Sequence, residues 1–273
     1  MGKRLTGTFE WAKHTDNCLR GCSHACRYCY ARYNDVERFK RATDAEWERP
    51  QLSADWDKPR HKLSDGVMFP TTHDILPRFI DPCMSVIEQH LQVGNKLLIV
   101  SKPHLFCIEE ILQMVPHRRH YRDLIVFRFT IGSVNDAVLS FWEPGAPCFA
   151  ERLACLKRAH EEGFETSVSA EPLLGGATLR PTPNAVSRLV GILTPYVTHS
   201  IWIGMMNRAG QRVRCDTPDE HEMLAVQLQG QELTTVKQIY DALKGNPLIR
   251  WKDSYCKALG LKQAAAPEMT DGS

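Results

Sequence analysis

The chain has 273 residues, with 34 Lys and Arg against 32 Asp and Glu, and 43% of the residues are hydrophobic. This length suits one large α/β domain or two small ones with a sizeable core. The near balance of charge excludes binding of nucleic acid through bulk positive charge, although not through a local basic patch. No segment reaches the ~18 uninterrupted apolar residues of a membrane span, so no membrane partner is expected.

The chain carries ten cysteines, and its first residues lack the apolar run of a signal peptide. Such usage predicts a reducing, cytoplasmic setting in which cysteines are thiols or metal ligands rather than disulfides. Residues 1–20 are expected to form an irregular lead-in, with Cys18 as a small buried thiol.

Residues 21–30 read Gly-Cys-Ser-His-Ala-Cys-Arg-Tyr-Cys-Tyr and place three cysteines at the spacing C-x3-C-x2-C. Thiolates are ligands for iron–sulfur clusters and for zinc, and one tight loop can bring three of them to one cluster. Cys22, Cys26 and Cys29 would leave one iron of a four-iron cluster without a protein ligand. An open position of this kind is what a catalytic metal site needs.

The alternative is a structural zinc site in which His24 or Cys18 joins the three cysteines. Zinc sites usually pair two C-x2–4-C knuckles that lie far apart in sequence, and no second knuckle follows here. The context of the motif therefore favours the cluster.

The next segment, residues 30–65, is polar and holds eight basic and eight acidic residues. It is expected to form a solvated helix and a long loop. A nucleic-acid surface needs a surplus of positive charge, and this segment has none.

A regular series of apolar runs follows, beginning near residues 67, 97, 124, 166 and 201. Continuous apolar runs are typical of strands that are buried on both faces. Helical patterns at 81–94, 108–114, 151–162 and 184–193 separate the runs, and a capping box opens another helix near 218. With one more strand before the cysteine loop, the alternation predicts six βα units with helices outside a parallel sheet. The expected fold is α/β, a partial (β/α)6 TIM-like barrel over residues 21–260, followed by a disordered tail at 261–273.

Polar residues follow the predicted strands. Parallel strands end on one rim, where ligands of such folds bind. We expect the cysteine loop to share that rim with Thr72, His73, Asp74, Lys102, Ser133, Asn135 and Glu171. Arginines of the loop 208–214 would also lie there and could clamp an anionic substrate, or be solvated loop charges: Arg208, Arg212 and Arg214. The basic run 117–122 is expected on the opposite face, as a solvated surface.

The three-cysteine motif, with Tyr28 directly before its last cysteine, resembles the signature of the radical S-adenosylmethionine (SAM) superfamily. Four further segments resemble the spore photoproduct lyase-like branch: residues 68–75, 100–102, 131–136 and 143–153. Residues 169–175 are also similar to a phage-associated radical SAM branch of unassigned activity. The resemblance covers residues 18–205.

This resemblance implies a four-iron, four-sulfur (4Fe–4S) cluster on the three cysteines, with SAM bound at the open iron. It implies an electron donor such as flavodoxin or ferredoxin, and reductive cleavage of SAM to a 5′-deoxyadenosyl radical that takes a hydrogen from a substrate. Transferred by position, Lys102 would bind the SAM carboxylate and Ser133 would contact the ribose.

Four more residues are implied to hold SAM. Tyr28 would pack beside the adenine and Tyr30 would contact it through its backbone. Asn135 and Glu171 are further candidates. For all of these cofactor residues, ordinary capping or turn chemistry is the alternative.

One departure from the lyase pattern concerns the substrate. Spore photoproduct lyases carry a hydrogen-donating cysteine before the Asp-Ile of the second strand end, and residues 69–74 here contain none. A threonine O–H bond is too strong to replace the thiol, so DNA photoproduct repair is not expected. Cys83, Cys107 or Cys215 could donate instead, or each is a buried thiol.

Three functions therefore stand side by side. The first is a radical SAM enzyme, a lyase or another subclass, that acts on an unidentified substrate. The second is a nucleic-acid lesion lyase or modification enzyme of the spore photoproduct lyase type. The third is a non-catalytic, zinc-binding interaction protein.

Overall fold

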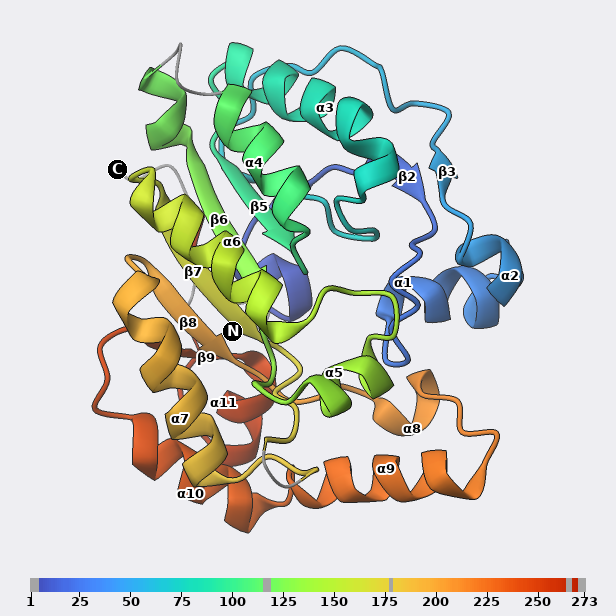
Figure 1. The fold of residues 1–273 in the computed structure, drawn as a ribbon, viewed down its shortest axis with the longest axis vertical. Helices are drawn as coiled ribbons and strands as arrows, with labels where there is room; N and C mark the ends of the chain where they lie inside the picture. The colour runs from blue at the N-terminus through green and yellow to red at the C-terminus, as the bar shows by residue number, and fades with distance from the viewer. Residues whose placement is uncertain (1–4, 115–118, 177–178, 264–266, 270–273) are drawn as a thin grey trace.

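The computed structural model describes residues 5–114, 119–176, 179–263 and 267–269 (Figure 1). Within them, seven strands form one parallel sheet in the order β1-β4-β5-β6-β7-β8-β9. Their bounds are His14–Thr15 (β1), Val67–Phe69 (β4), Leu97–Ser101 (β5), Ile125–Thr130 (β6), Glu165–Ala170 (β7), Ser200–Ile203 (β8) and Ile249–Trp251 (β9). A separate antiparallel pair joins β2 (Leu19–Arg20) and β3 (Gln51–Leu52).

Helices cover the outer face of the sheet, as the continuous apolar strands require. All six residues of β6 are buried, for example. Figure 1 shows the covering helices packed side by side: α3 (Ile80–Gln92), α4 (Leu105–Met114), α6 (Phe149–Glu161) and α7 (Pro183–Leu193). Towards the end of the chain follow α9 (Pro218–Gln229), α10 (Leu233–Leu243) and α11 (Asp253–Leu259).

Short helices gather where the strands end (Figure 1). They are α1 (Tyr30–Arg32), the π-helix η2 (Tyr33–Arg38), α2 (Asp44–Trp47), α5 (Asp136–Trp142) and α8 (Ala209–Arg212). Arg122 lies at the other rim, before β6, with its guanidinium 5.7 Å from the ring centroid of Phe164. The run 117–122 thus lies on the expected face, but it is not wholly solvated, because Tyr121 is buried in the core. Residues 117–118 lie outside the described residues.

The predicted α/β partial barrel is confirmed, and each predicted apolar run is a strand of the sheet. The seventh strand, β9, was not predicted. It has only three residues, with the exposed Arg250 in the middle, so no apolar run marks it. The strand expected before the cysteine loop is β1 at 14–15, which pairs with β4, so the sheet begins before the predicted bound at residue 21. No helix of the described residues is both long and apolar enough to cross a membrane.

Two segments far apart in sequence meet beside the sheet, and together we call them the closing seam (residues 7–11 and 267–269). The backbone N–H of Met269 donates to the carbonyl of Trp11 at 2.8 Å, and that of Gly66 donates to Met269 at 3.1 Å. The carboxylate of Glu268 pairs with the fully buried Arg128 inside the barrel. Residues 267–269 therefore differ from the expected disordered tail, because Glu268 compensates a buried cation. Residues 264–266 and 270–273 lie outside the described part.

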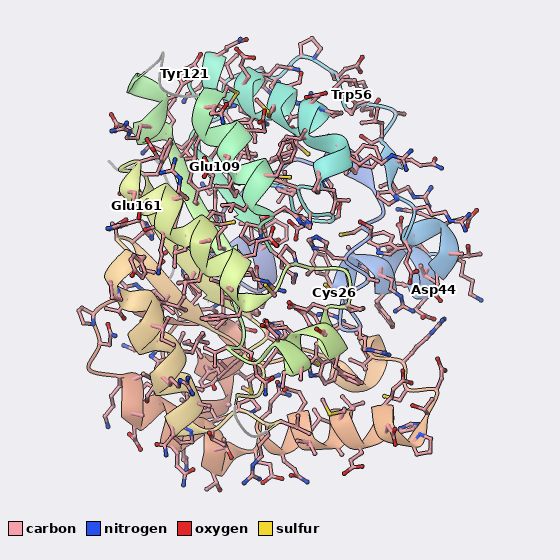
Figure 2. All side chains as sticks on the ribbon, viewed as in Figure 1. Cys26, Asp44, Trp56, Glu109, Tyr121 and Glu161 are labelled. Atoms are coloured by element: carbon pink, nitrogen blue, oxygen red, sulfur yellow. The ribbon has the colours of Figure 1, made fainter. Side chains whose placement is uncertain are left out.

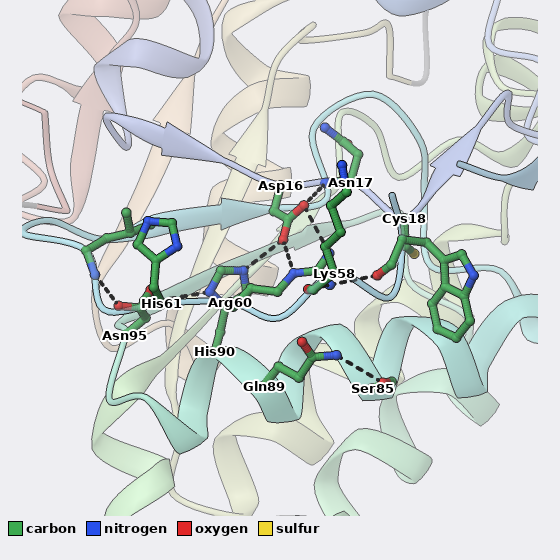
Figure 3. Close-up of polar contacts among 12 residues, drawn as sticks. Asp16, Asn17, Cys18, Lys58, Arg60, His61, Ser85, Gln89, His90 and Asn95 are labelled. Carbon is green, nitrogen blue, oxygen red and sulfur yellow. Dashed lines mark hydrogen bonds and ion pairs between the residues drawn. The ribbon is translucent and has the colours of Figure 1, made fainter. Parts of the chain in front are cut away.

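A polar network anchors the chain directly after β1 (Figure 3). Asp16 accepts hydrogen bonds from Arg60 Nε and from His90 Nε2, each at 2.9 Å. Asn95 donates to the other ring nitrogen of His90 at 3.0 Å, which leaves Nε2–H to donate to Asp16. Burial alone would raise the pKa of Asp16, but these hydrogen bonds lower it to about 2. Asp16 thus ties β1 to the long loop and to α3.

Candidate functional site

The cysteine loop of residues 21–30 lies on the rim at the strand ends and is held from two sides. Gly21 has φ +90°, and a Cβ there would overlap the carbonyl oxygen of Trp47, to which Cys22 N–H donates at 2.8 Å. On the other side, the N–H of Gly145 donates to the carbonyl of His24 at 3.0 Å. The loop is therefore clamped between α2 and the connection from α5 to α6. Figure 2 shows Cys26 inward of Asp44 on α2.

The three thiols of this loop form a donor set for a soft metal group. Cys22 and Cys26 are buried and Cys29 is half-buried. Burial and the nearby Asp74 raise the pKa of Cys22 to about 12, and burial also raises the pKa of Cys26. A bound cation is therefore needed to hold these groups as thiolate ligands.

The spacing of possible ligands also bears on the kind of metal. Across the described ranges, no three His, Cys, Asp or Glu side chains converge as ligands of a single ion. A four-iron cluster does not require such convergence, because it offers a separate iron to each thiolate. Three thiolates from one loop can therefore each bind a different iron of one cluster.

Asp74 connects the cysteine loop to the strand ends. Its Oδ2 lies 3.2 Å from Nδ1 of His24 and accepts the backbone N–H of Lys102 at 3.0 Å. Its other oxygen accepts from the hydroxyl of Ser101 and from the N–H of Ile75. Burial alone would raise the pKa of Asp74, but His24, Lys102 and Ser101 lower it well below its usual range. Asp74 is thus held ionised.

The side chain of Lys102 stands among negative groups. Burial would lower its pKa, but the nearby Cys26, Glu143 and Asp74 raise it above the usual range. Its Nζ lies 5.8 Å from the ring centroid of Tyr28. Among the described residues, no ion pair to this Nζ is formed. Lys102 is therefore a cation available to a ligand carboxylate.

A buried ion pair supports the rim behind Lys102. Arg152 Nη1 lies 2.6 Å from Glu143 Oε2, and the two side chains are 0% and 1% exposed. The hydroxyl of Tyr28 donates to the other oxygen of Glu143, and burial raises the pKa of this tyrosine. The ring of Tyr28 is thereby fixed next to Lys102. The sequence did not single out Glu143 and Arg152 as site residues, because Glu143 follows α5, Arg152 lies within α6, and neither follows a strand.

Comparison with known proteins bears on the fold. A spore photoproduct lyase variant superposes with a TM-score of 0.56 and 15% identity, over 91% of this chain and 79% of the lyase. A spore photoproduct lyase complexed with dinucleoside spore photoproduct gives 0.55 and 13%, over 88% and 76%. The chain has the fold of spore photoproduct lyase. The predicted resemblance to this radical SAM branch is confirmed at the level of the fold.

Sequence comparison adds a viral relative. An uncharacterized protein, ORF301 of Acidianus two-tailed virus, is 28% identical over 190 residues. The match spans 63% of this chain and 58% of the viral protein. No protein-family model matches the chain.

Three of the remaining cofactor candidates make internal hydrogen bonds on the lyase-like rim. The hydroxyl of Ser133 donates to the carbonyl of Gly175, and Asn135 Nδ2 donates to that of Gly176 at 2.7 Å. Asn135 also caps α5, as the turn alternative predicted. The hydroxyl of Tyr30 donates to the carbonyl of Thr71 at 2.6 Å. These bonds hold the rim together. Because the hydroxyl of Tyr30 is already bonded, the contact with adenine that the resemblance implies falls to the backbone of Tyr30.

Glu171 lies at the end of β7 and is held at both oxygens. Its Oε2 is 3.2 Å from Nζ of Lys252, and its Oε1 accepts from Asn207 Nδ2 at 3.2 Å. Lys252 follows the unpredicted strand β9, beyond the region of family resemblance, so no sequence signal pointed to it.

The structure places two of the three predicted hydrogen-donor thiols in the core, away from the rim. Cys83 and Cys107 are fully buried in the core between the sheet and its helices. The sulfur of Cys83 lies 3.5 Å from that of Cys18, which is buried as expected. Cys215 donates to the carbonyl of Glu220 at 3.4 Å. Cys83 and Cys107 thus match the alternative of buried thiols, whereas Cys215 is half-buried and follows α8.

The predicted substrate residues after β4 have different surroundings. His73 is buried, and its Nε2 accepts the backbone N–H of Cys18 at 3.0 Å, so it faces the outer core. Asp74 contacts His24 of the cysteine loop, so its carboxylate faces the rim. The half-buried Thr72 donates its backbone N–H to Asn17 Oδ1 at 2.8 Å. Among the described residues, the hydroxyl of Thr72 forms no hydrogen bond, in contrast to the side chains of His73 and Asp74.

The three predicted arginines also differ. Arg214 pairs with Glu37 at 2.7 Å and with Asp44, so its charge is already neutralised. Arg208 is exposed and lines a surface cavity of about 380 Å³ next to the end of β8. Arg212 lies 5.9 Å from the ring centroid of Tyr30, and its Nε is buried with no hydrogen-bond partner among the described residues. Burial lowers the pKa of Arg212, and Arg208 lowers it further.

Proposed function

We propose that this chain is a radical SAM enzyme. The clamped loop with the thiols of Cys22, Cys26 and Cys29, next to the available cation of Lys102, is the observation that carries the proposal. When bound, a 4Fe–4S cluster and SAM supply reductive chemistry that yields a 5′-deoxyadenosyl radical, which abstracts hydrogen from the substrate. Flavodoxin or ferredoxin would supply the electron.

The residues of the chain would bind and orient these groups. The three thiolates would hold three irons, and Lys102 would bind the SAM carboxylate through a charge-assisted hydrogen bond. Asp74 fixes the loop relative to Lys102. The pair of Glu143 with Arg152 closes the rim behind Tyr28, which would exclude water from the reacting atoms.

The substrate remains unidentified, but Arg212 supports one with an anionic group. A buried N–H without an acceptor costs roughly 1–3 kcal/mol, and more when it is charged. A phosphate or carboxylate of the substrate would supply the acceptor that Arg212 Nε lacks.

The deciding experiment is anaerobic reconstitution with iron and sulfide, followed by EPR of the reduced protein with and without SAM. A signal of a reduced four-iron cluster that shifts when SAM is added, together with formation of 5′-deoxyadenosine, would support the proposal. A colourless protein with one tightly bound zinc per chain would contradict it and support the zinc-binding interaction protein.

A second candidate is a nucleic-acid lesion lyase or modification enzyme. One local surface favours it, within the segment 30–65 that as a whole has no surplus of positive charge. The side chain of Phe39 is 47% exposed, and the guanidiniums of Arg38 and Arg41 lie 4.9 and 4.6 Å from its ring centroid. Stacking aromatics flanked by cations are typical of single-strand binding surfaces. The ion pair of Arg214 with Glu37 joins this turn to the α8 loop.

This candidate predicts that single-stranded DNA or RNA stimulates SAM cleavage and binds less tightly as salt increases. Phe39→Ala should weaken that stimulation without changing basal cleavage. Stimulation by peptides alone would contradict the nucleic-acid candidate and leave the first proposal in place.

A further inference from the structure

Lys252 is a buried cation that none of the functions above uses. It directly follows β9, and its side chain is 1% exposed. Its Nζ lies 2.8 Å from the carbonyl oxygen of Gly7, 2.7 Å from Glu10 Oε2 and 3.2 Å from Glu171 Oε2. An ammonium group has three N–H donors, and each has an acceptor here. The orientation of Nζ is therefore fixed by two segments of the chain, residues 7–10 and the end of β7.

The packing around Lys252 leaves it no room to move. Nζ lies 4.0 Å from the ring centroid of Trp11, which belongs to the closing seam. Gly204 lies on the other side of Lys252, between the side chains of Lys252 and Glu171. A Cβ at Gly204 would lie 2.8 Å from Cγ of Glu171 and 2.9 Å from Cγ of Lys252. The absence of a side chain at position 204 thus allows Lys252 and Glu171 to meet.

Glu171 is the partner of Lys252 that reaches the rim. Its side chain is 17% exposed, and its Oε1 is held by Asn207. Burial raises the pKa of Glu171 and the nearby Glu10 adds to the rise, whereas Lys252 and Arg212 oppose it. Without the ammonium of Lys252, two carboxylates would face each other in a buried site, and one of them would take up a proton.

We infer that Lys252 is a positioning residue of the cofactor site, which holds the carboxylate of Glu171 ionised and aimed into the barrel mouth towards SAM. This inference rests on the proposed radical SAM function and on the implied contact of Glu171 with SAM. Lys252 does not touch SAM itself. It acts through Glu171 and anchors the closing seam to the same site through Glu10.

The test compares KM for SAM and kcat for 5′-deoxyadenosine formation in the reconstituted wild type and three variants, Lys252→Met, Glu171→Gln and their combination. We expect Lys252→Met to raise KM for SAM about tenfold with kcat within about twofold, as for lost cofactor binding. In the Glu171→Gln background, Lys252→Met should raise KM no further, because both changes remove one interaction. Lys257→Met, which removes an exposed lysine on α11, should leave both constants unchanged.

A purely structural role of Lys252 predicts a different effect on KM for SAM. Lys252→Met would then lower the melting temperature and change KM by the same factor in both backgrounds, or leave KM unchanged, and either result would overturn the inference. If Lys252→Met does not fold, Gly204→Ala separates Lys252 from Glu171 while keeping both charges, and it should raise KM in the wild type but not in Glu171→Gln.

The wild type distinguishes the two levels of the proposal. A reconstituted wild type that forms no 5′-deoxyadenosine contradicts the radical SAM function, and this inference falls with it. An active wild type with independent effects of the two substitutions contradicts only the role of Lys252.

Discussion

His24 of the cysteine loop faces Asp74 at the end of β4, with 3.2 Å between Nδ1 and Oδ2. Because Asp74 also accepts the backbone N–H of Lys102, one carboxylate connects the proposed cluster ligands to the proposed SAM-binding lysine. Loss of this carboxylate would remove its contact with His24 and its hydrogen bond with Lys102 at the same time.

Asp74→Ala should therefore destabilise the protein and weaken loading of the cluster. Hydrogen bonds to a charged group contribute about 1.5–3 kcal/mol, so we expect a loss of about 2–3 kcal/mol in the free energy of unfolding. Urea denaturation of the protein before reconstitution measures this loss, and iron content measures loading. Asp57→Ala, at an exposed aspartate, is the control, and equal stability of the two variants would contradict the prediction.

Cys26→Ala should abolish both the cluster and SAM cleavage, because two thiolates from one loop cannot replace three. Iron and sulfide analysis, EPR and 5′-deoxyadenosine formation measure the outcome. Cys155→Ala removes another buried thiol, one in the outer core, and should keep the cluster. An active cluster in Cys26→Ala would refute the ligand assignment.

Lys102→Met should leave the cluster intact and impair SAM binding. The variant loses the cation that we propose for the SAM carboxylate, and losing a charge-assisted hydrogen bond of about 1.4–3 kcal/mol corresponds to roughly 10- to 100-fold weaker binding. The reduced cluster should keep its EPR signal, but the shift on adding SAM should need higher SAM concentrations. A SAM titration identical to that of the wild type would rule out this role.

Acid should weaken the protein through Asp16. Its pKa is lowered from 3.8 to about 2 in the folded state. A depressed pKa stabilises the folded state above pH 3.8, and this contribution is lost as pH falls from about 3.8 to 2. We expect Asp16 to contribute about 1–2 kcal/mol to the free energy of unfolding in this way, since the network is partly exposed and screened. The difference in unfolding free energy between wild type and Asp16→Asn should shrink over this pH range, and a constant difference would contradict the assignment.

The strands were the part of this molecule that could be predicted from sequence, whereas the cysteine ligands stay a prediction. The strands are buried on both faces and therefore appear as apolar runs, and the cysteines are close together in sequence. Lys102 was found because it follows a strand, and strand ends share one rim. These signals are local, so they need no knowledge of which distant segments meet.

The missed parts depend on long-range packing. His73 and Asp74 are neighbours in sequence, but one faces the outer core and the other the rim. Arg212 and Arg214 are two residues apart, and only the packing of their loop against Glu37 decides that Arg214 is already paired. Lys252 follows a strand too short to leave an apolar pattern.

The closing seam has a consequence for the order in which the barrel assembles. The contact of Lys252 with Gly7 joins positions 245 residues apart, so this contact forms only after nearly all of the chain has been arranged. Contacts of such long separation are slow to form and carry a large loss of chain entropy. A circular permutant that joins the two seam segments by a short linker, and opens the chain in an exposed loop, should therefore refold faster than the natural order.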